Sequence, residues 1–235
     1  MSRVVKRPEV RKREILDTAR QFFFHKGYDE TSIQDIIDTL SIAKGTFYHY
    51  FSSKIELLDE LTERMTSEIS ASLRQVLDSP TNAIDKFNAV IRMATALKLA
   101  NIDVLLVLLR VMFRDENAII REKMYRRIVE KNRELFSAIM RQGVEEGLFR
   151  TPDPEDAAEI ILELGKALNE RVSRLLLVKD KRVQELIRMI KKRTELYERV
   201  IEWVLGAAEG SIRVYLAHDF ENMVRLMKKN LGDQS

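Results

Sequence analysis

Residues 15–58 read ILDTARQFFFHKGYDETSIQDIIDTLSIAKGTFYHYFSSKIELL, and this stretch decides the fold of the N-terminal part of the chain. Its apolar residues recur with the spacing of helices, between short breaks that contain Gly27, Thr31 and Ser32, and a pair of serines. Glycine commonly ends a helix, whereas serine and threonine commonly begin one. The pattern predicts helices over residues 8–26, 33–40, 44–50 and 54–78.

The second and third of these helices are short and are joined by three residues, which is the geometry of a helix-turn-helix. In this motif the first turns of the second helix reach base edges in the major groove of DNA. Phe47 and Phe51 are expected to point inward. The residues expected at the DNA surface are Thr31, Ser32, Gln34, Lys44, Gly45, Thr46, Tyr48, His49 and Lys54.

The chemistry of these side chains suggests how each would act. Lys54 starts a helix, where free N–H groups and the helix dipole already favour a phosphate, and Thr31 and Ser32 offer similar chemistry one helix earlier. Lys44 and Gln34 are the best candidates for reading bases. Tyr48 could instead be part of an aromatic core, but its polar neighbours favour an exposed position.

The unit resembles the TetR family of bacterial transcriptional regulators, in the strings FFHKGYDETSIQDI, LSIAKGTFYHYF and SSKIELL. The resemblance implies a homodimer with two DNA-reading heads, usually a repressor that a small ligand releases. By this resemblance Tyr48 and Lys54 would bind phosphates, and Lys44, Gly45, Thr46 and Gln34 would face base edges. Asp35 and Asp38 depart from the basic or neutral residues that are often seen on that helix. The segment GVEEGLFRTPDPEDAAEII is similar to one that often precedes the penultimate, dimerising helix.

Composition favours an all-α fold for the whole chain. Only 8 Gly and 4 Pro occur in 235 residues, which leaves little room for turn-rich β architecture. We expect about ten helices, arranged as a basic arm with a DNA-binding domain over 1–53 and a larger ligand-binding and dimerising domain over 54–235. Helix 54–78 would connect the two. The further helices are expected over residues 82–99, 103–114, 116–146, 154–177, 181–207 and 210–230.

Several classes of protein are disfavoured. The chain has no cysteine, so it has neither disulfides nor thiolate metal sites. The most apolar run, residues 102–113, is too short to span a bilayer, and the N-terminus lacks a signal-peptide pattern. We therefore expect a cytoplasmic protein that does not contact membranes. Residues 1–13 hold six basic side chains and one acidic one, although the whole chain carries only +3, which suggests an anionic partner such as nucleic acid.

The helix expected over 116–146 carries a continuous apolar stripe with Asn132 at its centre. A buried amide needs partners, so Asn132 is either satisfied by protein or points into a cavity, and the first interpretation is preferred. Methionine and aromatic residues could line an adaptable apolar pocket or simply form a core. The candidate effector-pocket residues are Met93, Met112, Phe113, Tyr125, Asn132, Phe136 and Met140.

Apolar stripes on the helices over 154–177 and 181–207 predict a dimer interface, because two such helices and their symmetry mates would form a four-helix bundle. Gly165 would allow a close approach of the helices. The candidate interface residues are Ile161, Leu164, Gly165, Leu168, Val172, Tyr197, Val200 and Val204. No role is assigned to segment 211–235.

An enzyme is disfavoured, because the three histidines are isolated and no catalytic or cofactor-binding motif is present. No metal and no cofactor are expected. The hypothesis is a ligand-responsive homodimeric repressor that binds a palindromic operator in double-stranded DNA and leaves it when a small, largely apolar effector binds. The alternatives are a DNA-binding architectural protein and a ligand-dependent activator.

Overall fold

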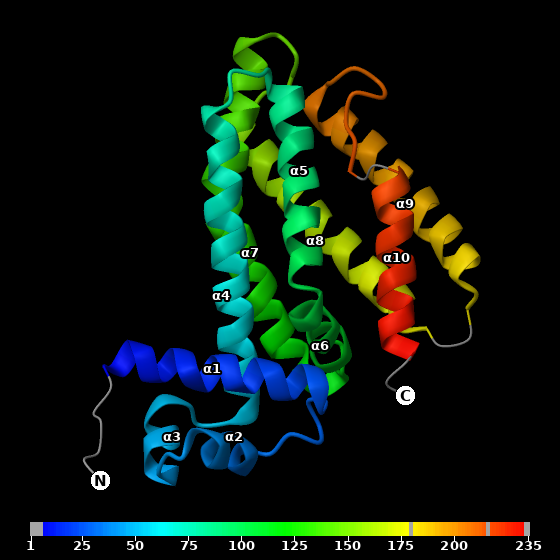
Figure 1. The fold of residues 1–235 in the computed structure, drawn as a ribbon. Helices are drawn as coiled ribbons and strands as arrows, with labels where there is room; N and C mark the ends of the chain where they lie inside the picture. The colour runs from blue at the N-terminus through cyan, green and yellow to red at the C-terminus, as the bar shows by residue number, and fades with distance from the viewer. Residues whose placement is uncertain (1–6, 179–180, 215–216, 233–235) are drawn as a thin grey trace.

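The computed structural model describes residues 7–178, 181–214 and 217–232, and within these ranges all regular secondary structure is helical (Figure 1). The first six residues of the basic arm lie outside them. The α-helices are α1 (Pro8–His25), α2 (Ile33–Leu40), α3 (Lys44–Tyr50), α4 (Lys54–Arg74), α5 (Ala83–Ala100), α6 (Ile102–Met112), α7 (Ala118–Glu145), α8 (Pro154–Leu177), α9 (Val183–Leu205) and α10 (Ala217–Gly232). The 3-10 segments are η1 (Gln75–Asp78) and η2 (Asp115–Asn117).

Local chemistry explains where the first helices begin. Ser32 caps α2 through a reciprocal pair of hydrogen bonds with Asp35, whose backbone N–H donates to the serine hydroxyl at 3.1 Å. Ser53 caps α4 in a similar way, by accepting from the backbone N–H of Glu56. These caps satisfy helix N–H groups that have no partner within the helix itself.

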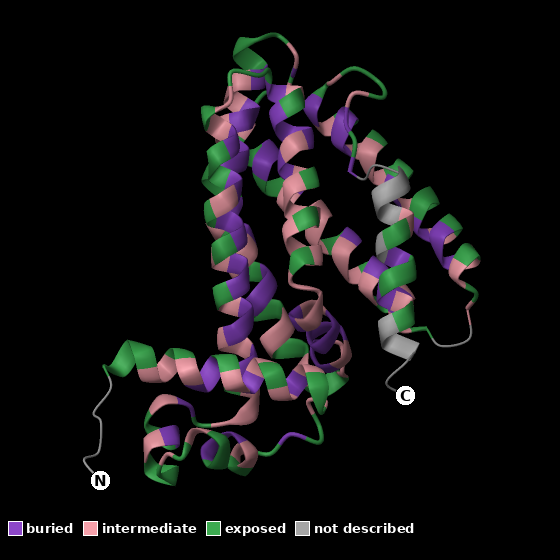
Figure 2. Ribbon diagram, viewed as in Figure 1, coloured by how far each residue is buried: buried purple, intermediate pink, exposed green. Residues whose placement is uncertain are grey.

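The helices fall into two groups, which we call the head (α1–α3) and the body (α4–α10). In the body α4, α5 and α7 stand roughly parallel, α8 passes behind α5, and α9 and α10 lie on one side (Figure 1). In the head α1 lies across the lower end of α4, with α2 and α3 beneath it. Buried residues follow the inner faces of these helices from the head into the body (Figure 2).

The expected all-α architecture with ten helices is confirmed, and most boundaries fall within a few residues of the prediction. The clearest difference is the last helix, which was expected to begin at 210 but begins at Ala217. Gly206 ends α9 in a left-handed conformation with φ of 59°. The chain then runs without helix through residues 211–214.

Side chains of the body hold this non-helical segment in place. Asn88 of α5 donates to the carbonyl of Ser211 at 2.9 Å and accepts from the backbone N–H of Arg213 at 2.8 Å. Carboxylates of α9 accept from the next N–H groups, Glu202 from Ile212 at 3.1 Å and Glu198 from Val214 at 2.8 Å. These four bonds replace those that a helix would have supplied.

Within the described ranges no helix is both long and apolar enough to cross a membrane.

Candidate functional site

Helix α3 presents a polar surface on the outside of the head. Lys44, Gly45 and His49 are exposed, and Tyr48 is 46% exposed, whereas Phe47 on the opposite side is fully buried. Lys44 Nζ lies 5.9 Å from the centre of the Tyr48 ring. The fold therefore places an aromatic hydroxyl and an ammonium together on the face that a helix-turn-helix turns toward DNA.

The fold itself does not require a glycine at position 45. A Cβ built on Gly45 would meet no heavy atom within 4 Å, and its φ is not positive. Glycine within a helix costs about 0.5–1 kcal/mol relative to alanine. Its presence fits the interpretation that something outside the protomer approaches the first turn of α3 closely.

Three expected DNA-surface residues on and before α2 have partners inside the head. Thr31 is buried, and its hydroxyl donates to the carbonyl of Gly27 at 2.6 Å. Ser32 is occupied as the cap of α2. The exposed Gln34 donates to Asp38 at 2.7 Å, a bond that solvent exposure leaves easy to exchange.

Lys54 differs most from expectation. Its ammonium donates to the carbonyls of Tyr28 at 2.6 Å and Thr31 at 2.9 Å, with a longer contact to Asp29 at 3.2 Å. It also lies 4.4 Å from the centre of the Tyr28 ring, and burial lowers its pKa. Lys54 therefore holds the α1–α2 loop against α4, instead of projecting freely toward a phosphate.

The departure noted at Asp35 also has a structural explanation. Lys26 Nζ donates to its carboxylate at 2.8 Å, and the backbone N–H of Ser32 donates at 2.7 Å. Together these bonds lower the pKa of Asp35 to about 2. The carboxylate thus occupies the N-terminus of α2, where a phosphate would otherwise find free N–H groups.

Both ends of α6 are joined to the head by paired hydrogen bonds between oppositely charged groups. Arg20 of α1 donates to both carboxylate oxygens of Asp103, at 2.5 and 2.8 Å. Arg114, just after α6, donates in the same paired manner to Asp29 in the α1–α2 loop, once at 2.9 Å. Burial acts to raise the pKa of Asp103, but hydrogen bonds, above all from Arg20, lower it overall. Such paired contacts fix orientation as well as distance.

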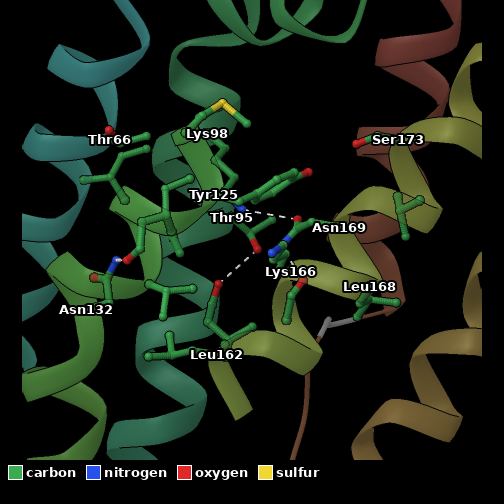
Figure 3. Close-up of a pocket in the computed structure, with 18 of the residues that line it drawn as sticks. Thr66, Thr95, Lys98, Tyr125, Asn132, Leu162, Lys166, Leu168, Asn169 and Ser173 are labelled. Carbon is green, nitrogen blue, oxygen red and sulfur yellow. Dashed lines mark hydrogen bonds between the residues drawn. The ribbon is translucent and has the colours of Figure 1, made fainter. Parts of the chain in front are cut away.

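The body encloses a cavity of about 280 Å³ that is predominantly apolar. Helices α4, α5, α6, α7 and α8 form most of its wall, part of which Figure 3 shows. Tyr197 and Ile201 of α9, Val214 in the segment before α10, and Met227 of α10 complete it. Val214 and Met227 belong to segment 211–235, to which the sequence assigned no role, and both contribute to this wall. A cavity of this kind can hold a small molecule, with a few polar groups to orient it.

Five of the seven expected pocket residues line the cavity: Met112, Phe113, Tyr125, Asn132 and Phe136. Met93 and Met140 do not. Met93 lies on another face of α5 than the lining residues Val90, Ala94 and Lys98, which follow one another at intervals of four. Met140 is one turn beyond Phe136, and its side chain is fully buried in the hydrophobic core.

Asn132 combines the two interpretations that the sequence left open. Its Nδ2 donates to the carbonyl of Ile128 in its own helix at 2.7 Å, so the amide is partly satisfied by protein. Its Oδ1 is buried and has no hydrogen-bond partner among the described residues. A buried acceptor without a partner is costly, and here it belongs to a residue of the cavity wall.

The apolar stripe expected at a dimer interface lies largely inside the protomer. Ile161, Leu168 and Val172 are buried and line the cavity, as do the partly buried Gly165 and Tyr197. Leu164, Val200 and Val204 are also partly buried. The exposed apolar side chains of these two helices are different ones, namely Ile160, Leu196 and Trp203, with exposed fractions of 48%, 56% and 75%. The structure thus places most of the predicted interface residues against the protomer's own helices, and the dimer interface stays a prediction.

Lys98 and Asn169, which the sequence did not single out, are notable polar residues of the cavity wall. Lys98 Nζ lies 3.5 Å from Asn169 Oδ1, across the gap between α5 and α8. A lysine on the apolar side of a predicted helix was the available signal. A lysine at a solvated helix end gives the same pattern, so this position alone does not indicate a residue of a cavity wall.

Comparisons with known proteins support the same interpretation of the head. Residues 15–61 match the family model described as bacterial regulatory proteins, tetR family. The chain is 29% identical over 158 residues to the HTH-type transcriptional repressor KstR2 of Mycobacterium tuberculosis, a match that covers 65% of this chain and 76% of that protein.

Solved structures resemble the chain over most of its length. A TetR-family transcriptional regulator from Pectobacterium atrosepticum superposes with a TM-score of 0.61 at 20% identity, over 84% of this chain and 95% of the other. A transcriptional regulator from Cytophaga hutchinsonii gives a TM-score of 0.55 at 15% identity, over 95% and 97%. At these identities the likeness concerns the fold. The head thus matches the tetR family model, and the chain as a whole resembles a transcriptional repressor in sequence and TetR-family regulators in fold.

Proposed function

We propose that the protein is a homodimeric, cytoplasmic repressor that binds a palindromic operator and is released by a small, largely apolar effector in the body cavity. Residues 1–53 would form the DNA-binding domain and 54–235 the effector-binding and dimerising domain. The single observation that carries this proposal is the position of α6. It lines the cavity with Leu108, Leu109 and Met112, and its two ends are ion-paired to the head.

The proposed mechanism follows from that position. An effector that prefers an altered cavity shape shifts the population toward it, and a displacement of α6 is passed to α1 through Arg20 and to the α1–α2 loop through Arg114. Helix α4 also lines the cavity and would move with it. In a dimer this changes the distance between the two heads, which must match half-sites about 34–36 Å apart, or a multiple of that distance.

At each half-site Lys44, Gly45, Thr46 and Gln34 would lie against base edges, and Tyr48 and His49 near the backbone. The exposure of α3 and the space around Gly45 support this assignment. Lys54 would act through the loop that it holds, since its ammonium already has carbonyl partners. The exposed Ile160, Leu196 and Trp203 would be buried between two protomers.

The test is selection of bound sequences from a random duplex pool by the purified full-length protein, followed by sequencing. The expected result is one enriched palindrome, bound at least about a thousandfold more tightly than random duplex. A DNA-binding architectural protein would give no enriched sequence, and that result would refute a sequence-specific repressor. With a palindrome in hand, transcription from it in a purified system separates a repressor from a ligand-dependent activator.

A further inference from the structure

The charged side chains that line the body cavity are of one sign. Lys98 and Lys166 are the only charged residues in the wall as far as the structure describes it, and no carboxylate belongs to it. The remaining polar groups are hydroxyls and amides, and most of the wall is aliphatic or aromatic. An uncompensated positive charge in such surroundings favours an anionic ligand.

The two lysines differ in how their charges are compensated. Lys166 Nζ lies 2.7 Å from a carboxylate oxygen of Glu122 and 3.6 Å from one of Glu163, so acidic partners outside the cavity neutralise it. Lys98 has no ion pair with any described residue. Its one hydrogen-bond acceptor is Asn169 Oδ1, at the limiting distance of 3.5 Å. Since an ammonium has three N–H donors, Lys98 retains donors that could bind a ligand.

Neighbouring side chains are arranged to leave those donors free. Asn169 Nδ2 donates to the carbonyl of Gly165 at 2.9 Å, which turns Oδ1 toward Lys98. Thr95, one turn earlier on α5, donates its hydroxyl to the carbonyl of Ile91 at 2.9 Å. Lys98, Tyr125 and Asn169 come from three helices and gather at one level of the cavity (Figure 3). Burial lowers the pKa of Lys98, as expected for an ammonium without a counter-charge.

We propose that the effector is a lipophilic carboxylate, whose carboxylate pairs with Lys98 Nζ while its apolar body fills the rest of the cavity. This inference rests on the proposed function, since it takes the cavity as the effector site. A carboxylate fits better than a phosphate, because a phosphate dianion has three oxygens to satisfy and more charge to neutralise. One ammonium and the few neutral donors of this wall can satisfy a monoanion.

The experiment is calorimetric titration of the full-length protein with pairs of molecules that differ only in charge. The acids are octanoate, decanoate, dodecanoate and 2-naphthoate, and each is compared with its neutral primary amide. At least one acid is expected to bind about ten- to a hundredfold more tightly than its amide, the range given by a hydrogen bond to a charged group. Equal affinity within every pair, or no binding by any acid, would overturn the proposal.

Variants of Lys98 test whether this residue causes the preference for acid over amide. Lys98→Met keeps most of the length of the side chain but removes the charge, and should abolish the preference for acid over amide while the amide still binds. Lys98→Gln, which keeps a donor, is the second variant in case the first does not fold. Arg92→Met is the matched control, because Arg92 is an exposed cation on the same helix. A preference that persists in a folded Lys98 variant would also overturn the proposal.

A second arm separates this inference from the proposed function. The same acids are added to the protein bound to its selected operator, and release is measured by fluorescence anisotropy. Binding through Lys98 without release would retain the lipophilic-carboxylate site and refute the effector mechanism. Release by compounds that show no preference for acid over amide would refute the carboxylate inference and leave the repressor intact.

Discussion

Replacing Trp203 with arginine should break the proposed dimer without unfolding the protomer. Trp203 is 75% exposed on α9, on the outward face that also carries Leu196. A tryptophan side chain has on the order of 250 Å² of surface, so about 190 Å² of it is open here. If dimerisation covers half of this area, each copy contributes about 2.4 kcal/mol at 25 cal/mol per Å². The two symmetry-related copies together contribute about 5 kcal/mol, or more than a thousandfold in the dimer Kd.

Sedimentation velocity over a range of protein concentrations measures this change directly. The matched control is Ile119→Arg, because Ile119 is equally apolar and 72% exposed but belongs to α7, outside the proposed interface. Wild type and the Ile119 variant should remain dimers at concentrations where the Trp203 variant is a monomer with unchanged far-UV circular dichroism. A dimer that survives Trp203→Arg but dissociates with Ile119→Arg would refute the interface.

The remaining predictions concern the head, its link to the body and the cavity. Lys54→Met should lower the free energy of unfolding by about 1.5–3 kcal/mol in denaturant titrations without changing the salt dependence of DNA binding. Lys44→Met should leave the free energy of unfolding unchanged and reduce the slope of the logarithm of the DNA-binding constant against the logarithm of salt concentration by about one. Gly45→Val should change the free energy of unfolding by no more than about 1 kcal/mol but weaken binding to every DNA duplex. Unchanged binding would contradict a close approach of DNA to the first turn of α3. Asp103→Arg should abolish the effect of the effector on operator affinity, measured by titrating the operator with and without effector. Adding Arg20→Asp rebuilds the ion pair with its charges exchanged, and should restore the effect if the pair transmits it. Asn132→Leu should stabilise the ligand-free protein by about 1–3 kcal/mol in calorimetric unfolding, because it removes a buried acceptor without a partner.

Local sequence signals were sufficient to predict the head. The bounds of α2 and α3 agree with the prediction, because Ser32 and the short turn before Lys44 are local signals that act within a few residues. The partners of Lys54 could not be predicted, for the opposite reason. The carbonyls that it contacts belong to residues 23 and 26 positions earlier in the chain, Thr31 and Tyr28, and no sequence window around Lys54 reveals them.

In the body, periodicity identified the helices but not which apolar face meets which partner. Helices α8 and α9 have apolar residues on two faces, and the regular stripe through Ile161 and Leu168 turned out to line the protomer's own cavity. A stripe reports burial without distinguishing an intramolecular partner from a second chain. The start of α10 was misplaced because side chains outside segment 211–214 supply its hydrogen bonds, two of them from Asn88, more than a hundred residues away.

In the proposed mechanism, filling the cavity lowers the affinity of the heads for DNA. Its most direct test is the Kd for the selected palindrome, measured by fluorescence anisotropy with and without a saturating compound that calorimetry has shown to bind in the cavity. We expect the compound to weaken operator binding about 5–150-fold, and the operator to weaken binding of the compound by the same factor. An operator Kd that stays the same when the cavity is filled would contradict this mechanism.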